Sequence, residues 1–285
     1  MFSIPRIKEM MEKYGMAPLK KLGQNFLTSE GVLRKIVASA DLSAEGGSAR
    51  QPAGGKKTDV VLEVGPGFGV LTAELAREAA KVIAVEKDKK MVRALKDNLA
   101  EWGIENVSII HGDVLKMEMK SLLPAKYKVV ANIPYYITSP IIRKFLEKEE
   151  IKPELIVLLV QKEVARRICA KPPRLNLLAV SVQFFGNPKI EFYVPAGAFY
   201  PKPKVDSAVI KIVPFEKPLL PKERISDFFA LVKAGFASPR KQLAANLARH
   251  FKITREKVEE IFSELGFGLK IRTENLSVKD WLDLF

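Results

Sequence analysis

A glycine-rich segment, Glu63-Val-Gly-Pro-Gly-Phe-Gly69, has the strongest potential for ligand chemistry in this sequence. Glycine allows a sharp turn and lets the backbone approach a bound group closely. An acidic residue, Glu86, follows about 20 residues further on, where a carboxylate can accept hydrogen bonds from both hydroxyls of a ribose. Taken alone, the glycine-rich segment is also consistent with an ordinary tight turn between a strand and a helix.

Two further segments, His111-Gly-Asp113 and Asn132-Ile-Pro-Tyr135, carry polar and aromatic side chains. In the second of them the proline stiffens the turn, the asparagine presents a side-chain carbonyl, and the tyrosine offers a flat ring. A turn proline with a capping asparagine is the plainer interpretation of that segment by itself.

The elements that must position these residues alternate between strands and helices. We predict strands at 59–64, 81–85, 107–110, 128–131 and 155–160, and helices at 70–80, 88–102, 140–146 and 162–170. This alternation predicts an α/β fold with a mostly parallel sheet covered on both faces. The glycine segment, Glu86, Asp113 and Asn132 each follow a strand, so they meet at the edge where such sheets bind ligands. A nucleoside-bearing cofactor explains this arrangement, and the spacing alone leaves a dinucleotide open.

Toward the C-terminus the pattern changes. Strand-like segments at 189–194 and 207–213 have no helix between them, which predicts an antiparallel pair at one side of the sheet. The proline-rich segment 214–221 indicates a domain boundary, and the residues after it have a helical pattern, with a predicted cap and first-turn proline at Ser238-Pro239. Residues 41–58 contain four glycines and indicate a flexible surface insertion.

The turn Asn132-Ile-Pro-Tyr135, together with the glycine segment, resembles the amino-group methyltransferases that use S-adenosylmethionine. Three more segments look like signature segments of the ribosomal RNA adenine dimethyltransferases: Lys20-Lys-Leu-Gly-Gln-Asn-Phe-Leu27, Phe199-Tyr-Pro-Lys-Pro-Lys-Val-Asp-Ser207 and Phe236-Ala-Ser-Pro-Arg-Lys-Gln-Leu243. The resemblance runs from about residue 18 to the C-terminus, apart from the insertion. The last segment and the length of the helical tail look more like the small-subunit enzymes than the large-subunit, antibiotic-resistance enzymes.

This resemblance implies a Rossmann-like class I methyltransferase domain over 1–214 and a small all-α, RNA-binding domain over 215–285. It implies transfer of methyl groups from S-adenosylmethionine to N6 of two adjacent adenines in a hairpin loop near the 3′ end of small-subunit ribosomal RNA. The expected partner is that RNA or the assembling small ribosomal subunit, and the expected role is in its biogenesis.

The resemblance also carries roles onto matching positions of this sequence. Asn132 and Tyr135 are the expected catalytic residues, with Tyr135 and Phe199 on the two faces of the target adenine. Lys202 and Lys204 are expected to bind the RNA substrate. The expected cofactor-binding residues are Asn25, Leu27, Gly65, Gly67, Glu86, Asp113 and Asn132.

Composition narrows the class of protein further. There are 47 Lys and Arg against 33 Asp and Glu, a formal net charge of +14. This excess suggests a polyanionic partner such as nucleic acid or an anionic membrane, and a lysine-rich solvated surface explains it equally well. The single cysteine, Cys169, excludes a disulfide framework, and two distant histidines argue against a metal site. The longest apolar run, 155–160, is too short to cross a bilayer, and the N-terminal charges exclude a signal peptide. We therefore expect a cytoplasmic monomer that needs neither membrane nor metal.

Four alternatives remain beside this interpretation. A large-subunit ribosomal RNA methyltransferase would share most of the signature segments. A non-catalytic ribosome-assembly or RNA-binding factor would keep the basic surface without needing an intact cofactor site. A DNA adenine methyltransferase and a nicotinamide-dependent oxidoreductase are disfavoured by the helical tail and by the Asn-Ile-Pro-Tyr turn, respectively.

Overall fold

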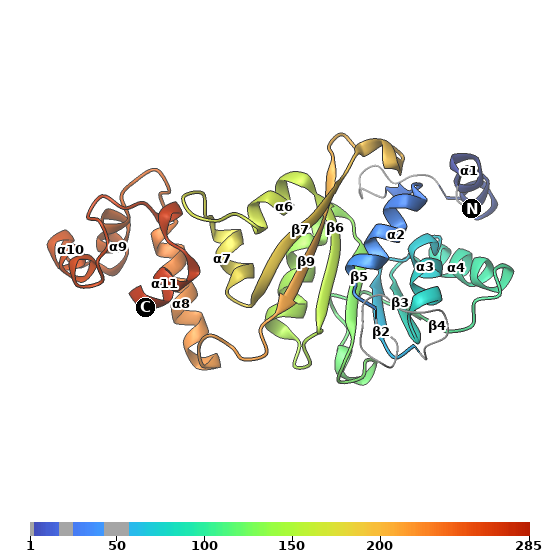
Figure 1. Ribbon diagram of the computed structural model, residues 1–285, viewed down its shortest axis with the longest axis horizontal. Coiled ribbons are helices and arrows are strands. Elements are labelled where there is room, and N and C mark those ends of the chain that lie inside the picture. Colours follow the sequence, from blue (N-terminus) through green and yellow to red (C-terminus); the bar gives the residue numbers. More distant parts are fainter. Residues whose placement is uncertain (1–2, 17–24, 43–56) are drawn as a thin grey trace. The chain divides into compact units, whose positions relative to one another are not determined.

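The computed structural model describes residues 3–16, 25–42 and 57–285. Most of the predicted insertion at 41–58 and the first part of the segment that begins at Lys20 therefore lie outside the described residues. The helices and strands of the described residues trace the central sheet (Figure 1).

A seven-stranded sheet forms the centre of the α/β part of the chain, with the strand order β4-β3-β2-β5-β6-β9-β7. The first five of these strands are parallel, and β9 runs antiparallel to β6, so the predicted α/β class and mixed sheet are confirmed. The chain places β9 between β6 and β7, an order that the sequence pattern did not indicate. The strands are β2 (Val60–Val64), β3 (Lys81–Glu86), β4 (Val107–His111), β5 (Lys128–Asn132), β6 (Leu155–Gln161), β7 (Gly186–Val194) and β9 (Ser207–Pro214).

The strand order creates a switch point between β2 and β5. After β2 the chain moves outward through β3 and β4, then returns to add β5 on the other side of β2. The connections that leave these two neighbouring strands therefore run in opposite directions and open a crevice at their carboxyl ends. The glycine-rich turn follows β2 and the Asn132 turn follows β5, so both border this crevice.

Helices cover the sheet as the apolar pattern predicts. α2 and α3 pack against one face, where Val61, Val82 and Val130 belong to the same buried cluster as Leu33 and Leu75. The helices of the α/β part are α1 (Ile4–Lys13), α2 (Glu30–Ser39), α3 (Val70–Glu78), α4 (Lys89–Glu101), α5 (Thr138–Arg143) and α6 (Lys162–Ile168), with short turns of other helix types at η2 (Met119–Ser121), η3 (Tyr135–Ile137), η4 (Lys144–Lys148) and η5 (Ala196–Ala198).

One strand of a small second sheet borders the crevice, and the N-terminal helix packs behind it. β1 (Phe26–Leu27) pairs antiparallel with β8 (Phe199–Tyr200), which joins segments far apart in the sequence. Ile7, Met10 and Met11 of α1 are buried in one cluster with Phe26, Phe68, Met91 and Ala94. α1 thus supports the aromatic residues that flank the glycine turn.

The remaining helices form a second compact unit, Arg166–Pro188 with Phe215–Phe285. Our predicted division placed 166–188 with the first domain, whereas the structure groups it with the helices, because Val180 and Phe184 share a core with Phe228 and Trp281. Its elements are α7 (Leu177–Gln183), α8 (Lys222–Gly235), α9 (Leu243–Phe251), α10 (Arg255–Glu264), η6 (Thr273–Asn275) and α11 (Val278–Leu284).

The predicted helix start at Ser238-Pro239 is wrong. These residues lie in a turn, and α9 begins only at Leu243. The Asn246 side chain donates hydrogen bonds to the carbonyls of Gly235, at 2.7 Å, and Ser238, at 3.0 Å, which holds the turn in place of a helical first turn.

Candidate active site

The glycine turn has the backbone conformation that only glycine adopts readily. Gly65, Gly67 and Gly69 have φ angles of +68°, +58° and +89°. Space restricts Gly69 as well, since a Cβ there would lie 2.5 Å from a Leu95 methyl carbon, whereas a Cβ on Gly67 would make ordinary contact with the Phe26 ring at 3.4 Å. The turn therefore fits its surroundings only with glycine at these positions, and it brings backbone to the edge of the cavity.

Glu86 at the end of β3 holds the glycine turn from the neighbouring strand. Its carboxylate accepts a hydrogen bond from the Gly67 N–H at 3.3 Å and another from the Asp88 N–H at 2.9 Å. Burial raises the pKa of this carboxyl above its usual range, while the hydrogen bonds oppose that shift. Asp88 in turn caps α4 by accepting from Lys90 and Met91, which confirms the predicted helix start there.

Glu63 is a second acidic residue at the cavity, with no role predicted from the sequence. Glu63 lies near the end of β2 and lines the same cavity. It is only 1% exposed, and its Oε2 makes no hydrogen bond within the described residues. Burial raises the pKa of Glu63 to about 8. The nearby Thr72 hydroxyl, which makes no hydrogen bond of ordinary geometry, opposes this rise, and the neighbouring acid Glu86 adds to it. Its place inside a buried strand directly before the glycine turn was the available signal.

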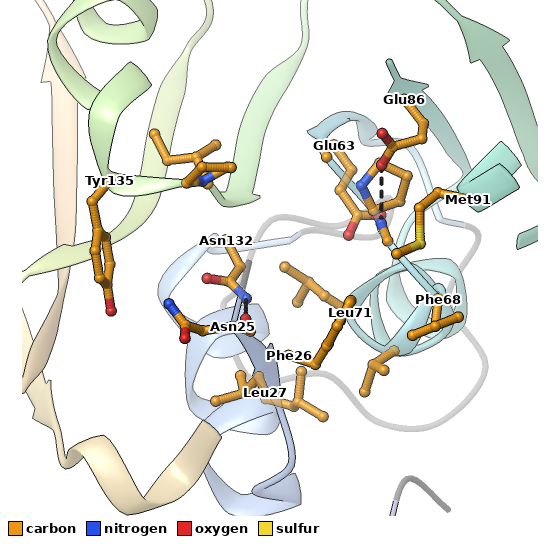
Figure 2. Close-up of a pocket in the computed structure, with 17 residues that line it drawn as sticks. Asn25, Phe26, Leu27, Glu63, Phe68, Leu71, Glu86, Met91, Asn132 and Tyr135 are labelled. Atoms are coloured by element: carbon orange, nitrogen blue, oxygen red, sulfur yellow. Dashed lines mark hydrogen bonds between the residues drawn. The ribbon is translucent and has the colours of Figure 1, made fainter. Parts of the chain in front are cut away.

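The other side of the cavity comes from the turn after β5. The Asn132 amide donates to the Asn25 carbonyl at 3.3 Å, which leaves the side-chain oxygen on the side of Tyr135 (Figure 2). The Tyr135 hydroxyl is hydrogen-bonded to Ser207 at 2.9 Å, and burial raises its pKa. Asn132 and Tyr135 are thus held from two directions, Asn132 by the residue before β1 and Tyr135 by the first residue of β9.

The structure brings most of the predicted site residues to one cavity. In Figure 2, Glu63 lies between Asn132 and Glu86, as expected from the position of β2 between β5 and β3. The residues that line the cavity are Asn25, Phe26, Leu27, Leu33, Glu63, Gly65, Pro66, Gly67, Phe68, Val70, Leu71, Glu86, Met91, Asn132, Ile133, Pro134 and Tyr135. Two acids and no Lys, Arg or His occur in this lining among the described residues.

Four predicted residues do not line this cavity. Asp113 follows β4 and accepts from Lys87 at 3.0 Å and from the Leu115 N–H at 3.1 Å. Desolvation by itself would raise the pKa of Asp113. The hydrogen bonds from Lys87 and Leu115 lower it by more, so the pKa lies below its usual range. Phe199 is 3% exposed and packs opposite Leu27, behind the cavity wall. Lys202 and Lys204 are exposed beyond β8.

Comparison with known proteins decides what this cavity belongs to. Residues 18–285 match the family described as ribosomal RNA adenine dimethylase. The chain belongs to this family. A ribosomal RNA small subunit methyltransferase A from Dehalococcoides mccartyi is 45% identical over 279 residues, which cover 97% of this chain and 90% of the relative.

Two solved structures of related enzymes have the same fold as this dimethylase family member. The 23S rRNA methyltransferase ErmE aligns with a TM-score of 0.72 at 28% identity over 91% of this chain and 98% of that one. A dimethyladenosine transferase from Plasmodium falciparum aligns with a TM-score of 0.73 at 27% identity over 91% and 95% of the two chains. The fold is that of a Rossmann-like methyltransferase, as predicted.

S-adenosylmethionine is the cofactor of this family, and the residues present fit it. The cradle of the glycine turn admits close approach of a ligand, and the buried Glu63 oxygen without a partner suits a ligand that carries positive charge. Within the described ranges, no three His, Cys, Asp or Glu side chains are grouped to hold a metal ion. In the same residues, no helix combines the length and apolar character needed to span a membrane.

Proposed function

We propose that this protein dimethylates N6 of two adjacent adenines in a hairpin loop near the 3′ end of small-subunit ribosomal RNA. The observation that carries the proposal is that one cavity joins Glu86 and the glycine turn to Asn132 and Tyr135. A family member at 45% identity named for the small subunit supports the choice of substrate. The activity serves biogenesis of the small ribosomal subunit.

When bound, S-adenosylmethionine supplies an electrophilic methyl group on its sulfonium. An exocyclic adenine amine is a poor nucleophile because its lone pair is delocalised into the ring. The Asn132 side-chain oxygen and the Ile133 carbonyl accept hydrogen bonds from the two N–H groups of the amine. These hydrogen bonds localise the lone pair of the nitrogen toward the methyl group. Asn132 and Ile133 would thus hold the amine nitrogen toward the methyl group that the bound cofactor would supply, and the proton lost by the methylated amine would pass to water. Most of the acceleration comes from alignment and preorganised acceptors.

Tyr135 stacks on the target base, a contact worth roughly 1–3 kcal/mol per base. Its hydrogen bond to Ser207 fixes the ring at the mouth of the cavity. The base must leave any stack or already lie in a loop to reach this position. A second stacking partner at Phe199 requires that ring to turn out of the core, and this role stays a prediction.

The predicted cofactor-binding residues lie on one side of the cavity, and the target base is expected on the other. Asn25, Leu27, Gly65, Gly67 and Glu86 line the side where the cofactor binds. Asp113 is at the same sheet edge, next to β3, where it would border the adenine ring of the cofactor. Asn132 lies between the two substrates.

Basic side chains bind the RNA backbone. Lys202 and Lys204 are exposed, and the proposed RNA-binding domain over 215–285 adds further Lys and Arg. Such contacts hold phosphates without selecting bases, so RNA affinity falls steeply as salt rises whereas cofactor affinity hardly changes. Filter binding of RNA and calorimetry of the cofactor over the same salt series measure both.

Incubation with labelled S-adenosylmethionine and, separately, small-subunit particles, large-subunit RNA and DNA tests the activity. We expect label only in adenines of the small-subunit RNA, as N6,N6-dimethyladenosine. Label in the large-subunit RNA would favour the second candidate, which the similarity to the 23S rRNA methyltransferase ErmE supports. No label in any RNA would leave a non-catalytic assembly factor.

The protein acts as a cytoplasmic monomer that needs no metal in this proposal. Sedimentation at micromolar concentration should give the mass of one chain, 31.8 kDa. Activity that survives a chelator would support the absence of a metal requirement, and a mass of two chains would contradict the monomer.

A further inference from the structure

Tyr136 is a large aromatic side chain that the proposed reaction does not use. It is 62% exposed, the largest exposed fraction among the large apolar and aromatic side chains of the described residues. Its hydroxyl makes no hydrogen bond to any of these residues. A single exposed ring is common on protein surfaces, and its neighbours decide whether it serves binding.

Tyr135 and Tyr136 are consecutive in η3 and face opposite directions along the sheet edge. In a 3-10 helix, successive side chains are about 120° apart. The Tyr135 hydroxyl is hydrogen-bonded to Ser207 of β9. The pKa of Lys87, the residue after β3, is raised chiefly by its ion pair with Asp113 and also by the Tyr136 phenol, which places that phenol near Lys87. β9 and β3 lie on opposite sides of β5, so the two rings diverge.

Tyr136 also lies between two cavities. Tyr135 precedes it and lines the cavity of the active site, whereas Ser139 follows it and lines a second cavity. Leu115, in the turn after β4, borders this second cavity from the other side. The remaining lining comes from α5 and η4 and consists of Pro140, Arg143, Lys144 and Lys148. A strand of RNA that runs from the first cavity to the second therefore passes Tyr136.

The second cavity presents a cation that no described residue neutralises. Arg143 is paired with Glu147, and the buried Lys144 is paired with Glu149. Lys148 is exposed and makes no ion pair within the described part of the chain. Such a lysine suits a phosphate of the nucleic-acid backbone.

We propose that Tyr136 stacks on the nucleotide next to the target adenine and that Lys148 binds the phosphate beyond it. When the target base leaves its stack for the cavity, the neighbouring base loses a stacking partner, and the Tyr136 ring replaces that partner. Every base offers a ring face to an aromatic side chain, and one such contact changes affinity by about 10–100-fold. The proposal rests on the proposed function, in which the other adenine of the pair is one such neighbour.

Methylation of small-subunit particles that carry a synthetic 3′ RNA segment tests the stacking contact. Three particles are compared: one with ordinary RNA, one with an abasic nucleotide on the 5′ side of a target adenine, and one with an abasic nucleotide on its 3′ side. The kcat/KM at that adenine is measured for the wild type, Tyr136→Ala and Tyr136→Phe.

Tyr136→Ala should lower kcat/KM about 10–100-fold on the ordinary particle, and Tyr136→Phe should stay within a few-fold of the wild type. Because an RNA strand has a direction, Tyr136 meets the neighbour on one side only. On the particle that is abasic on this side, the wild type and Tyr136→Ala should be equal, because no base is left to stack. On the other abasic particle the loss should persist in full.

Two further measurements separate stacking from a structural role. Tyr193→Ala removes a ring that is 49% exposed on β7 and should keep the wild-type kcat/KM on all three particles. The Kd of S-adenosylmethionine should not change in Tyr136→Ala, because Tyr136 does not line the first cavity. Lys148→Gln should reduce the slope of log affinity for the particles against log salt by about 1.

Wild-type kcat/KM in Tyr136→Ala would overturn the stacking contact, and so would an equal loss from this variant on both abasic particles. A Tyr136→Phe protein as poor as Tyr136→Ala would also overturn it, since the hydroxyl would then carry the effect. An unchanged salt slope in Lys148→Gln would remove the phosphate site. These results leave the proposed function intact, whereas ordinary particles that the wild type does not methylate would overturn the proposed function and this contact together.

Discussion

The two sides of the cavity differ in charge and in exposure. At the ends of β2 and β3, Glu63 and Glu86 are buried acids beside a glycine turn that packs under α1 and its apolar cluster. At the end of β5, Asn132 and Tyr135 are neutral, and the next residue, Tyr136, is 62% exposed. One side is acidic and enclosed, and the other is neutral and reaches solvent.

This difference matches what each substrate needs. A cationic cofactor gains from carboxylates that burial keeps out of water, because charge interactions strengthen where the dielectric is low. An adenine amine must instead remain neutral and be oriented, which calls for an amide oxygen, a backbone carbonyl and a stacking ring rather than a charge. We therefore expect changes on the β5 side to alter turnover and changes on the β2–β3 side to alter cofactor affinity.

Asn132→Ala should have the largest effect. Removing a preorganised hydrogen-bonding group at the reacting centre costs about 100–1000-fold in kcat, while cofactor affinity measured by calorimetry should change only a few-fold. Asn132→Asp keeps an acceptor oxygen and should recover part of the rate. Full turnover by Asn132→Ala on small-subunit particles would show that the two sides of the cavity are not divided in this way.

Tyr135→Ala should cost about 10–100-fold in kcat/KM for RNA, the loss expected from one base-stacking contact of roughly 1–3 kcal/mol. Tyr135→Phe keeps the ring and loses only the hydrogen bond to Ser207, so it should restore most of the activity. Steady-state kinetics on small-subunit particles distinguish the two variants. If Phe is as poor as Ala, the hydroxyl matters and stacking is the wrong account.

Glu86→Gln probes the acidic side and should act on binding. The change removes the charge that accepts from Gly67 and Asp88, and a weakened charged hydrogen bond costs about 1.5–3 kcal/mol. The Kd for S-adenosylmethionine should rise about tenfold or more, with kcat at saturating cofactor within a few-fold of the wild type. A drop in kcat alone, with Kd unchanged, would contradict the division of the cavity.

The sequence predicted those features that local pattern determines. The strands and the helix start at Asp88 form as predicted, because each depends on neighbouring residues in the chain. Three site features lie at the ends of strands of one parallel sheet: the glycine turn, Glu86 and Asn132. Their meeting at the switch point could therefore also be predicted.

The features that were missed depend on partners distant in the sequence. The helix signal at Ser238-Pro239 is overridden by Asn246 and by Thr273, whose hydroxyl donates to the Gly235 carbonyl at 2.9 Å. The burial of Phe199 follows from the pairing of β8 with β1. The lack of a hydrogen bond at Glu63 Oε2 within the described residues depends on β3, β5 and α3 together, so no local motif could show it.

The smallest effect concerns stability and tests the acidic side without any ligand. The pKa of Glu63 is raised in the folded protein, so between about pH 4.5 and 8 the folded chain holds a proton that the unfolded chain has released. The contribution of this bound proton to the free energy of unfolding is therefore fully present below about pH 4.5 and is lost as pH rises toward 8. Relative to Glu63→Gln, the melting temperature of the wild type should fall with pH by roughly 2–4 °C per unit, the shift that about 1 kcal/mol produces in a chain of this size. Parallel melting curves would mean that Glu63 is ionised in the empty cavity, and the β2–β3 side would then carry permanent charge.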